Sequence, residues 1–140
     1  DKRVVVIDDS IVRGTTARAR IVNLREAGAK EVHVRVSCPP HRFSCHYGID
    51  FPDPRDLIAN QMSQDEIRRF LGADSIGYLD VDGMIRACAP LEPNHFCLAC
   101  FTGDYPVNFS SETGKLVLEH RKQKNAPLVS KEEMSQKRLF

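Results

Sequence analysis

The stretch from Val4 to Thr16 constrains this chain more than any other part of its sequence. It reads Val-Val-Val-Ile-Asp-Asp-Ser-Ile-Val-Arg-Gly-Thr-Thr and leads into a helix-forming segment that begins at Ala17. The apolar run predicts a short strand over residues 3–7, of the kind buried on both faces of a parallel sheet. A loop that joins such a strand to a helix N-terminus directs backbone amides at a ligand, and is typical of a site for a phosphorylated molecule.

Two adjacent acids, Asp8 and Asp9, end the strand. Carboxylates repel phosphate, but they suit the hydroxyls of a sugar and a hard cation such as Mg²⁺. A plainer alternative stays open, because an ordinary strand followed by a helix N-cap at Thr15 or Thr16 gives the same pattern. The turn holds only one glycine and no Gly-x-x-x-x-Gly-Lys-Ser/Thr occurs, so a dinucleotide fingerprint and a P-loop are poor fits.

The next segments predict a βαβ unit. Residues 16–27 follow a helical pattern, and Gly28 stands where a glycine after a helix end is expected. Residues 31–37 alternate between apolar and polar side chains, which predicts a strand, and a strand, helix and strand in this order imply a parallel crossover. His33 on that strand is expected to be structural rather than catalytic.

Further elements are predicted along the chain. We expect a loop over 38–52, a short helix from Asp53-Pro54, a helix opened by the capping-box spacing of Ser63 and Glu66 and ended by Gly72, a strand over 75–79, a short helix near 81–88, and an irregular lobe over 89–106. Beyond about Asn108 the polar, lysine-rich sequence predicts a tail or a solvated helix.

The bulk properties exclude several classes of function. The chain has 140 residues, enough for one core, and a formal net charge of +1, which gives no electrostatic case for nucleic acid as a partner. It has no apolar run of membrane-spanning length and no signal peptide, so we expect a cytoplasmic protein without a membrane partner. Because the first residue is Asp1 and the first element a strand, we expect a fragment.

The five cysteines predict metal ligation rather than a disulfide framework, because their number is odd and no secretion signal is present. Cys97 and Cys100 form a Cys-x-x-Cys pair that can act together with Cys45. Zinc stays open as the metal, with a nearby histidine completing the site: His41, His46 or His95. Cys38 and Cys88 are expected to be ordinary buried thiols.

The stretch Val4–Thr16 resembles the loop with which type I phosphoribosyltransferases bind phosphoribosyl pyrophosphate (PRPP), and in its detailed form it resembles the amidophosphoribosyltransferase family. The likeness continues in order through Leu24–Ala29, Cys45–Asp50 and Cys97–Gly103. Arg13 replaces the small residue found in many other phosphoribosyltransferases, which favours this branch. Asp50 is expected to shape the loop beside Cys45, not to act as a catalyst.

The resemblance implies an α/β fold: a partial parallel sheet of the type I phosphoribosyltransferase fold with a C-terminal cysteine-bearing extension. The expected divisions are 1–88, the C-terminal half of the phosphoribosyltransferase domain; 89–108, a cysteine-bearing lobe; and 109–140, a polar tail or helix. The implied enzyme converts PRPP, glutamine and water to 5-phosphoribosylamine, pyrophosphate and glutamate, the first committed step of purine synthesis. A glutaminase domain upstream and a homo-oligomer are implied as partners, and the fragment alone is expected to be inactive.

The resemblance also assigns site residues. The expected PRPP-binding residues are Asp8, Asp9, Ser10, Ile11, Val12, Arg13, Gly14, Thr15 and Thr16, with Asp8 and Asp9 also holding Mg²⁺. Cys45, Cys97 and Cys100 are expected to be three ligands of a [4Fe–4S] cluster whose fourth ligand lies upstream of this chain. No residue is expected to be a general base, because positioning and charge neutralisation suffice for an oxocarbenium-like transition state.

Two other functions stay open. One is a regulatory module, since some relatives of the phosphoribosyltransferase fold bind PRPP without catalysis, although Arg13 and the cysteine trio count against this alternative. A zinc-stabilised interaction domain is the third candidate.

Overall fold

The computed structural model describes residues 1–49 and 53–107. Residues 1–106 form one compact unit. Asp50 and the predicted tail lie outside the described residues, so the expectations for both stay predictions.

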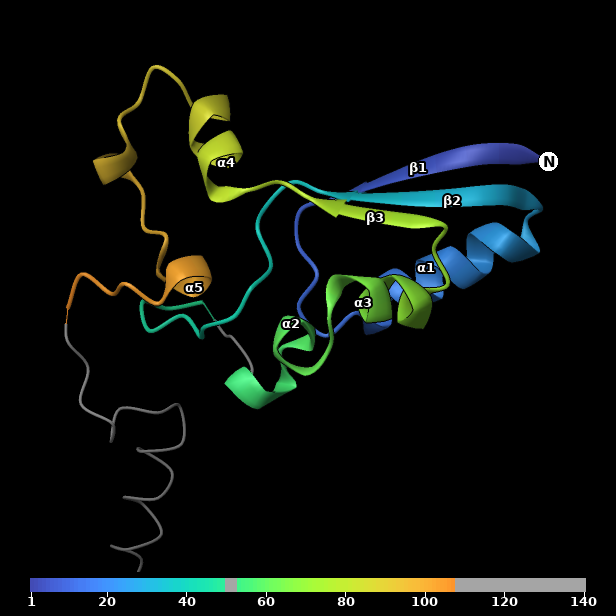
Figure 1. Cartoon of the computed structure of the whole chain (residues 1–140), viewed down its shortest axis with the longest axis horizontal. Coiled ribbons are helices and arrows are strands. Elements are labelled where there is room, and N and C mark those ends of the chain that lie inside the picture. Colours follow the sequence, from blue (N-terminus) through green and yellow to red (C-terminus); the bar gives the residue numbers. More distant parts are fainter. Residues whose placement is uncertain (50–52, 108–140) are drawn as a thin grey trace, which may run out of the picture. The chain divides into compact units, whose positions relative to one another are not determined.

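The unit is built on a three-stranded parallel sheet, in the order β1-β2-β3 (Figure 1). Its strands are β1 (Lys2–Asp8), β2 (Ala29–Val36) and β3 (Ser75–Tyr78). Val6 pairs with Val34, which pairs with Ile76 on its other side. The predicted α/β class and parallel crossover are therefore confirmed, with β2 beginning two residues earlier than expected.

One face of the sheet carries the core. The helices α1 (Thr15–Glu26), α2 (Ile58–Gln61) and α3 (Gln64–Leu71) lie on this side (Figure 1). The fully buried side chains between the helices and the sheet include Ile21, Val32, Val34, Ile67 and Leu71. Burial of such aliphatic side chains contributes about 1.5–3 kcal/mol each, so this layer stabilises the unit strongly.

The opposite face of β1 is exposed. Val5 is 60% and Ile7 77% exposed, whereas Val4 and Val6, which alternate with them, are half-buried toward the helices. The prediction that residues 3–7 are buried on both faces is therefore wrong for the described unit. The reason is that β1 is an edge strand and no described helix packs on that side of it (Figure 1).

The predicted helix signals are largely confirmed. The Ser63 side chain accepts the N–H of Glu66, the Glu66 carboxylate accepts the N–H of Ser63 at 2.8 Å, and Gly72 ends α3. A 3₁₀ turn, η1 (Pro54–Asp56), follows Asp53 as expected, and α4 (Val81–Ala87) forms where a short helix was predicted. The lobe expected to be irregular contains two short helices, η2 (Pro93–His95) and α5 (Ala99–Thr102).

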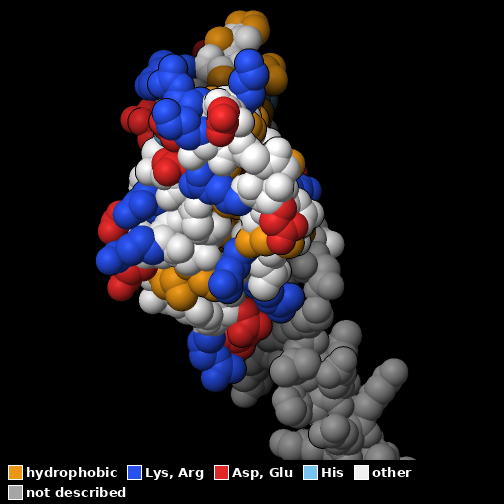
Figure 2. All heavy atoms as spheres, turned by 90° about the vertical axis from the view of Figure 1, so that its right-hand side faces the viewer, with side chains coloured by type: hydrophobic (Ala, Val, Ile, Leu, Met, Phe, Trp, Pro, Cys, Tyr) orange, Lys and Arg blue, Asp and Glu red, His pale blue; other side chains and the backbone are white. Residues whose placement is uncertain are grey.

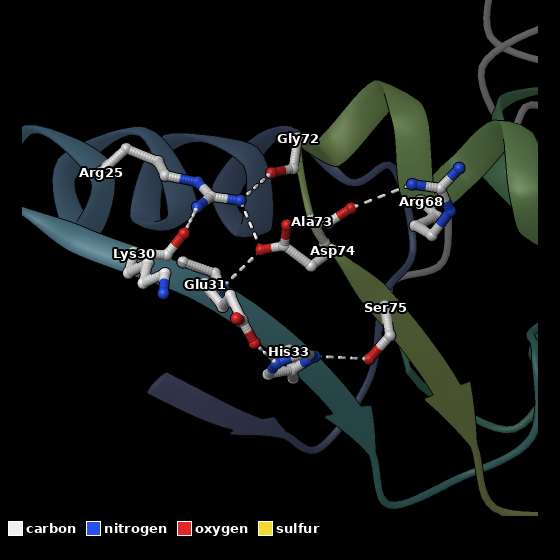
Figure 3. Close-up of polar contacts among 10 residues, drawn as sticks. Arg25, Lys30, Glu31, His33, Arg68, Gly72, Ala73, Asp74 and Ser75 are labelled. Atoms are coloured by element: carbon white, nitrogen blue, oxygen red, sulfur yellow. Dashed lines mark hydrogen bonds and ion pairs between the residues drawn. The ribbon is translucent and has the colours of Figure 1, made fainter. Parts of the chain in front are cut away.

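A group of polar contacts made by Arg25 and Asp74, here called the polar clasp, joins the helices to the sheet at the end where β2 begins (Figure 3). The Arg25 guanidinium donates to the carbonyl oxygens of Lys30, at 2.7 Å, and Gly72, at 3.3 Å, and pairs with the Asp74 carboxylate. Asp74 also accepts the backbone N–H of Val32 at 2.6 Å. The clasp therefore fixes α1, β2 and the turn before β3 to one another.

His33 lies beside the clasp, between the Ser75 hydroxyl at 2.9 Å and the Glu31 carboxylate at 3.1 Å (Figure 3). These contacts join β2 to β3, as expected of a structural histidine. Figure 2 faces the end of the molecule where β1 begins and shows Lys and Arg side chains interspersed with Asp and Glu. None of the described helices is long and apolar enough to cross a lipid bilayer.

Candidate functional site

A cavity of about 440 Å³ opens where β1 ends. It is lined by Asp8, Asp9, Ser10, Ile11, Val12, Arg13, Gly14, Thr15, Thr16, Ala17 and Arg20. The structure thus brings together all nine residues that the sequence predicted to bind PRPP. They come from the end of β1, the loop after it and the first turn of α1, so one continuous stretch of chain forms the lining.

The loop offers unpaired backbone donors to the cavity. Among the described residues, the N–H groups from Ile11 to Ala17 have no hydrogen-bond acceptor, whereas the N–H of Ser10 donates to Asp9 Oδ1 at 2.8 Å. The helix α1 has Gly14 as its N-cap, with no side-chain cap and no acid in its first turn. Neither threonine is therefore the N-cap, and the positive end of the helix is open to an anion.

Gly14 is required by the close packing beneath the loop. Its φ of 78° lies in the left-handed region, where a side chain is strained. A Cβ at this position would lie 2.8 Å from Ile58 Cδ1 and 3.1 Å from Phe70 Cε1. The close approach holds the loop against α2 and α3.

The two acids differ in their surroundings. Asp8 is only 16% exposed at its side chain, and its Oδ2 accepts a 3.0 Å hydrogen bond from Nη1 of Arg20. Asp9 is exposed. Sequence reasoning missed Arg20, although the helical period gives the signal: residue 20 follows Thr16 by four positions and so shares its side of α1.

Arg13, the other arginine of the lining, pairs with Asp56 of η1 at 3.4 Å, with both side chains more than half exposed. In water such a pair contributes little stability. Arg13 therefore remains available to a ligand.

The cysteine trio gathers near α5. Cys100 is half-buried on α5, Cys45 is half-buried in the loop that follows β2, and Cys97 is exposed. The N–H groups of Arg42 and Phe43 both donate to the Cys100 carbonyl oxygen at 3.1 Å, which attaches the Cys45 loop to α5. Burial raises the pKa of Cys100, and the nearby thiolates of Cys45 and Cys97 raise it further.

The described side chains do not form a compact ligand group for a single metal ion. Within the described part of the chain, no three His, Cys, Asp or Glu side chains come close enough to hold one metal ion. Zinc needs such a tight tetrahedral group. In an iron–sulfur cluster each cysteine binds a different iron atom, so all-cysteine ligands stand further apart.

Cys38 lies between the cavity and the cysteine trio. It is 8% exposed, and burial, with smaller contributions from the charges of Cys100, Asp9 and Asp8, raises its pKa to about 11. Its neighbour His41 stacks on Phe101 with ring centroids 4.8 Å apart. Cys38 is therefore a buried thiol, as predicted.

Cys88 differs from the prediction. It follows the last turn of α4 and is exposed, because no described element packs over it. The expectation that it is a buried thiol is wrong.

Comparison with known proteins gives the family. No family model matches the chain. The amidophosphoribosyltransferase of Mycobacterium leprae is 48% identical over 126 residues, covering 85% of this chain and 22% of that protein. Chloroplastic amidophosphoribosyltransferase 2 of Arabidopsis thaliana is 54% identical over 106 residues, covering 76% of this chain and 19% of that protein. The chain belongs to the amidophosphoribosyltransferase family.

Solved structures give the same family and the same fold. A structure described as the allosteric regulatory enzyme of purine biosynthesis matches with a TM-score of 0.75 and 46% identity, over 84% of this chain and 26% of that one. The glutamine PRPP amidotransferase of Bacillus subtilis, complexed with ADP and GMP, matches with a TM-score of 0.75 and 45% identity, over 83% and 26%. The chain spans about a quarter or less of the amidophosphoribosyltransferases it matches. The fold and family predicted from sequence are confirmed.

Proposed function

We propose that this chain is the PRPP-binding part of an amidophosphoribosyltransferase. The whole enzyme would convert PRPP, glutamine and water to 5-phosphoribosylamine, pyrophosphate and glutamate, the first committed step of purine synthesis. The cavity at the end of β1 carries the proposal, because it combines open backbone donors with two carboxylates. The Bacillus subtilis relative, which is complexed with ADP and GMP, binds ligands that contain the same ribose phosphate unit.

Each part of PRPP has a matching group in the cavity. The free amides after Ser10 and the hydroxyls of Thr15 and Thr16 would hold the 5′-phosphate at the N-terminus of α1. The carboxylates of Asp8 and Asp9 would accept hydrogen bonds from the ribose hydroxyls. The two carboxylates are oxygen ligands that would suit Mg²⁺, and the ion would supply positive charge to neutralise the departing pyrophosphate.

The chain's own contribution to the reaction at C1 is positioning. A ribose fixed at its phosphate and at its hydroxyls presents C1 in one orientation, which favours attack by ammonia as pyrophosphate leaves. No side chain of the lining is required as a general base. Ammonia would come from a glutaminase domain elsewhere in a longer polypeptide, so we expect the chain alone to show neither glutaminase activity nor appreciable transferase activity.

The acids test the proposal directly. Asp8→Asn and Asp9→Asn should each weaken binding of PRPP in the presence of Mg²⁺ about tenfold or more, as measured by calorimetry. Asp82→Asn, which removes an exposed acid of α4 outside the cavity lining, should leave the affinity unchanged. Unchanged PRPP affinity in both cavity variants would contradict the proposal.

A regulatory module that binds PRPP without catalysis is the second candidate, since the same cavity would serve it. Turnover separates the two functions. Release of pyrophosphate by the longer polypeptide supplied with PRPP and glutamine supports the enzyme, and tight PRPP binding without release supports the regulatory module.

We further propose that Cys45, Cys97 and Cys100 hold three corners of a [4Fe–4S] cluster, with the fourth ligand outside this chain. The Cys-x-x-Cys pair, together with the attachment of the Cys45 loop to the Cys100 carbonyl oxygen through the N–H groups of Arg42 and Phe43, supports the cluster. Anaerobically purified protein should contain iron and acid-labile sulfide in about a 4:4 ratio. Cys97→Ser should lower both contents, whereas Cys88→Ser should not, and zinc without sulfide would contradict the proposal.

The exposed side of β1 supports a larger assembly. Parallel sheets are ordinarily covered on both faces, yet Val5 and Ile7 face outward here. We infer that another part of a longer polypeptide covers them. The divisions at residues 88 and 108, the glutaminase domain, a homo-oligomeric state and a cytoplasmic location belong to this proposal.

A further inference from the structure

The two adjacent acids differ in how many of their carboxylate oxygens accept a hydrogen bond. Both oxygens of Asp8 are engaged: Oδ1 accepts the N–H of Asp9 at 3.2 Å, and Oδ2 accepts Arg20 at 3.0 Å. Oδ1 of Asp9 accepts the N–H of Ser10, whereas Oδ2 of Asp9 accepts no hydrogen bond among the described residues. Oδ2 of Asp9 is therefore the carboxylate oxygen of the two acids that is open to a ligand.

Arg20 has the charge and the position to compete with a cation. Arg20 lines the cavity, and its guanidinium hydrogen-bonds Oδ2 of Asp8, an oxygen that could otherwise bind a divalent ion. Guanidinium and metal ion are both positive, so they cannot share that oxygen without repulsion. The Asp8 side chain is mostly shielded from water, which strengthens this competition relative to a fully exposed pair.

We propose that Arg20 is a positioning residue that fixes Asp8 and keeps the bare divalent cation from binding both acids before the sugar phosphate arrives. The proposal rests on the proposed function of the cavity as a site for PRPP with Mg²⁺. A bare cation then binds only Asp9 and binds weakly. The cation accordingly enters with the anionic ligand, whose phosphates add ligands to the metal and draw the guanidinium away from Asp8.

Arg18 provides a matched control on the same helix. Its guanidinium lies over the Phe70 ring, 5.0 Å from the centroid, and it is not among the residues that line the cavity. Substitution of either arginine by glutamine removes one positive charge from α1. Only substitution of Arg20 releases Asp8.

The test measures binding of Mn²⁺, as a paramagnetic stand-in for Mg²⁺, to the full chain by electron paramagnetic resonance. Without PRPP, Arg20→Gln should tighten Mn²⁺ binding about fivefold, the equivalent of ~1 kcal/mol. Arg18→Gln should change the affinity less than twofold, and Arg20→Lys should keep it near the wild-type value. With PRPP present, the difference in Mn²⁺ affinity between the wild type and Arg20→Gln should become smaller. Circular dichroism checks that each variant is folded.

The outcomes separate this inference from the function on which it rests. Unchanged or weaker Mn²⁺ binding in Arg20→Gln, or equal tightening in Arg18→Gln, would overturn the role of Arg20. Asp9→Asn serves as the reference for the site itself. If Asp9→Asn and Asp8→Asn both bind Mn²⁺ and PRPP as the wild type does, the cavity is not the proposed site, whatever Arg20 does.

Discussion

The backbone N–H of Ile58 donates a 2.9 Å hydrogen bond to the carbonyl oxygen of Val12, which joins α2 to the loop that lines the cavity. Ile58 is buried, and its side chain meets the loop again beneath Gly14. The carbonyl side of the loop is thus attached to the core while the N–H side faces the cavity. The donors are held in place before a ligand binds, so little conformational entropy is lost on binding.

Gly14→Ala should destabilise the fold more than the same change at Gly28. Both glycines have a positive φ, which costs alanine roughly 1–2 kcal/mol. A Cβ at Gly28 meets nothing within 4 Å, whereas at Gly14 it collides with Ile58 and Phe70. Overpacking should add about 1–3 kcal/mol at Gly14 alone. Urea unfolding measures both, and equal losses would show that the loop relaxes without strain.

Asp74 should make stability depend on pH in the acid range. The N–H of Val32, and then Arg25, hold the pKa of Asp74 below its ordinary 3.8. As the pH falls, the unfolded chain takes up this proton first, so the contribution is fully present above pH 3.8 and is lost as the pH falls through the folded pKa. Asp74→Asn should therefore lower the melting temperature at neutral pH. It should also make the melting temperature depend less on pH in the acid range.

Arg25→Gln separates the two causes of the lowered pKa of Asp74. Because the Val32 N–H, the largest single cause of the lowered pKa, remains in this variant, part of the acid dependence should be retained. Thermal melts recorded between pH 7 and pH 2.5 measure the effect. A profile for Asp74→Asn that runs parallel to the wild type throughout would disprove the assignment.

Cys38 and Cys88 should differ sharply in reactivity. The reactive species is the thiolate, and the pKa of about 11 leaves Cys38 protonated as well as buried. Cys88 is exposed. With iodoacetamide at about pH 8, mass spectrometry should find Cys88 modified well before Cys38. Denaturation with urea should abolish the difference, and early labelling of native Cys38 would contradict its burial.

The exposed side of β1 can be tested with two changes to threonine. Ile7→Thr should alter the unfolding free energy of the 140-residue chain by no more than about 0.5 kcal/mol, because Ile7 already faces solvent. Val32→Thr places a hydroxyl in the core and should cost about 1–3 kcal/mol. Equal costs would mean that the face of Ile7 is covered in solution.

Strong local signals predicted most of the fold. The apolar run of β1, the alternation of β2 and the capping box of α3 each contain their signal within a few residues, and the structure has all three. The helix α2 has no such signal, because it is four residues long and is held by the buried side chain of Ile58 and the bond to Val12. Contacts distant in sequence are invisible to a local pattern.

Most of the residues that line the cavity were also expected from the sequence. The lining residues are contiguous, so the nine expected from the motif all meet in the cavity. Arg20 was missed because its role depends on which face of α1 meets the loop. The exposure of Val5 and Ile7 was missed for another reason. An apolar strand pattern indicates that both faces of a strand suit burial, but it does not tell which segment packs on each face.

The continuity of the cavity lining has one further consequence. All the residues that line the cavity lie between Asp8 and Arg20, so a sugar phosphate bound as we propose would be held by one continuous segment. Such a segment would bind the sugar phosphate, while the neighbouring parts of the protein would determine which atom attacks the sugar. Chemistries that differ only in their nucleophile can therefore share it unchanged, and diverge by exchanging the neighbouring parts.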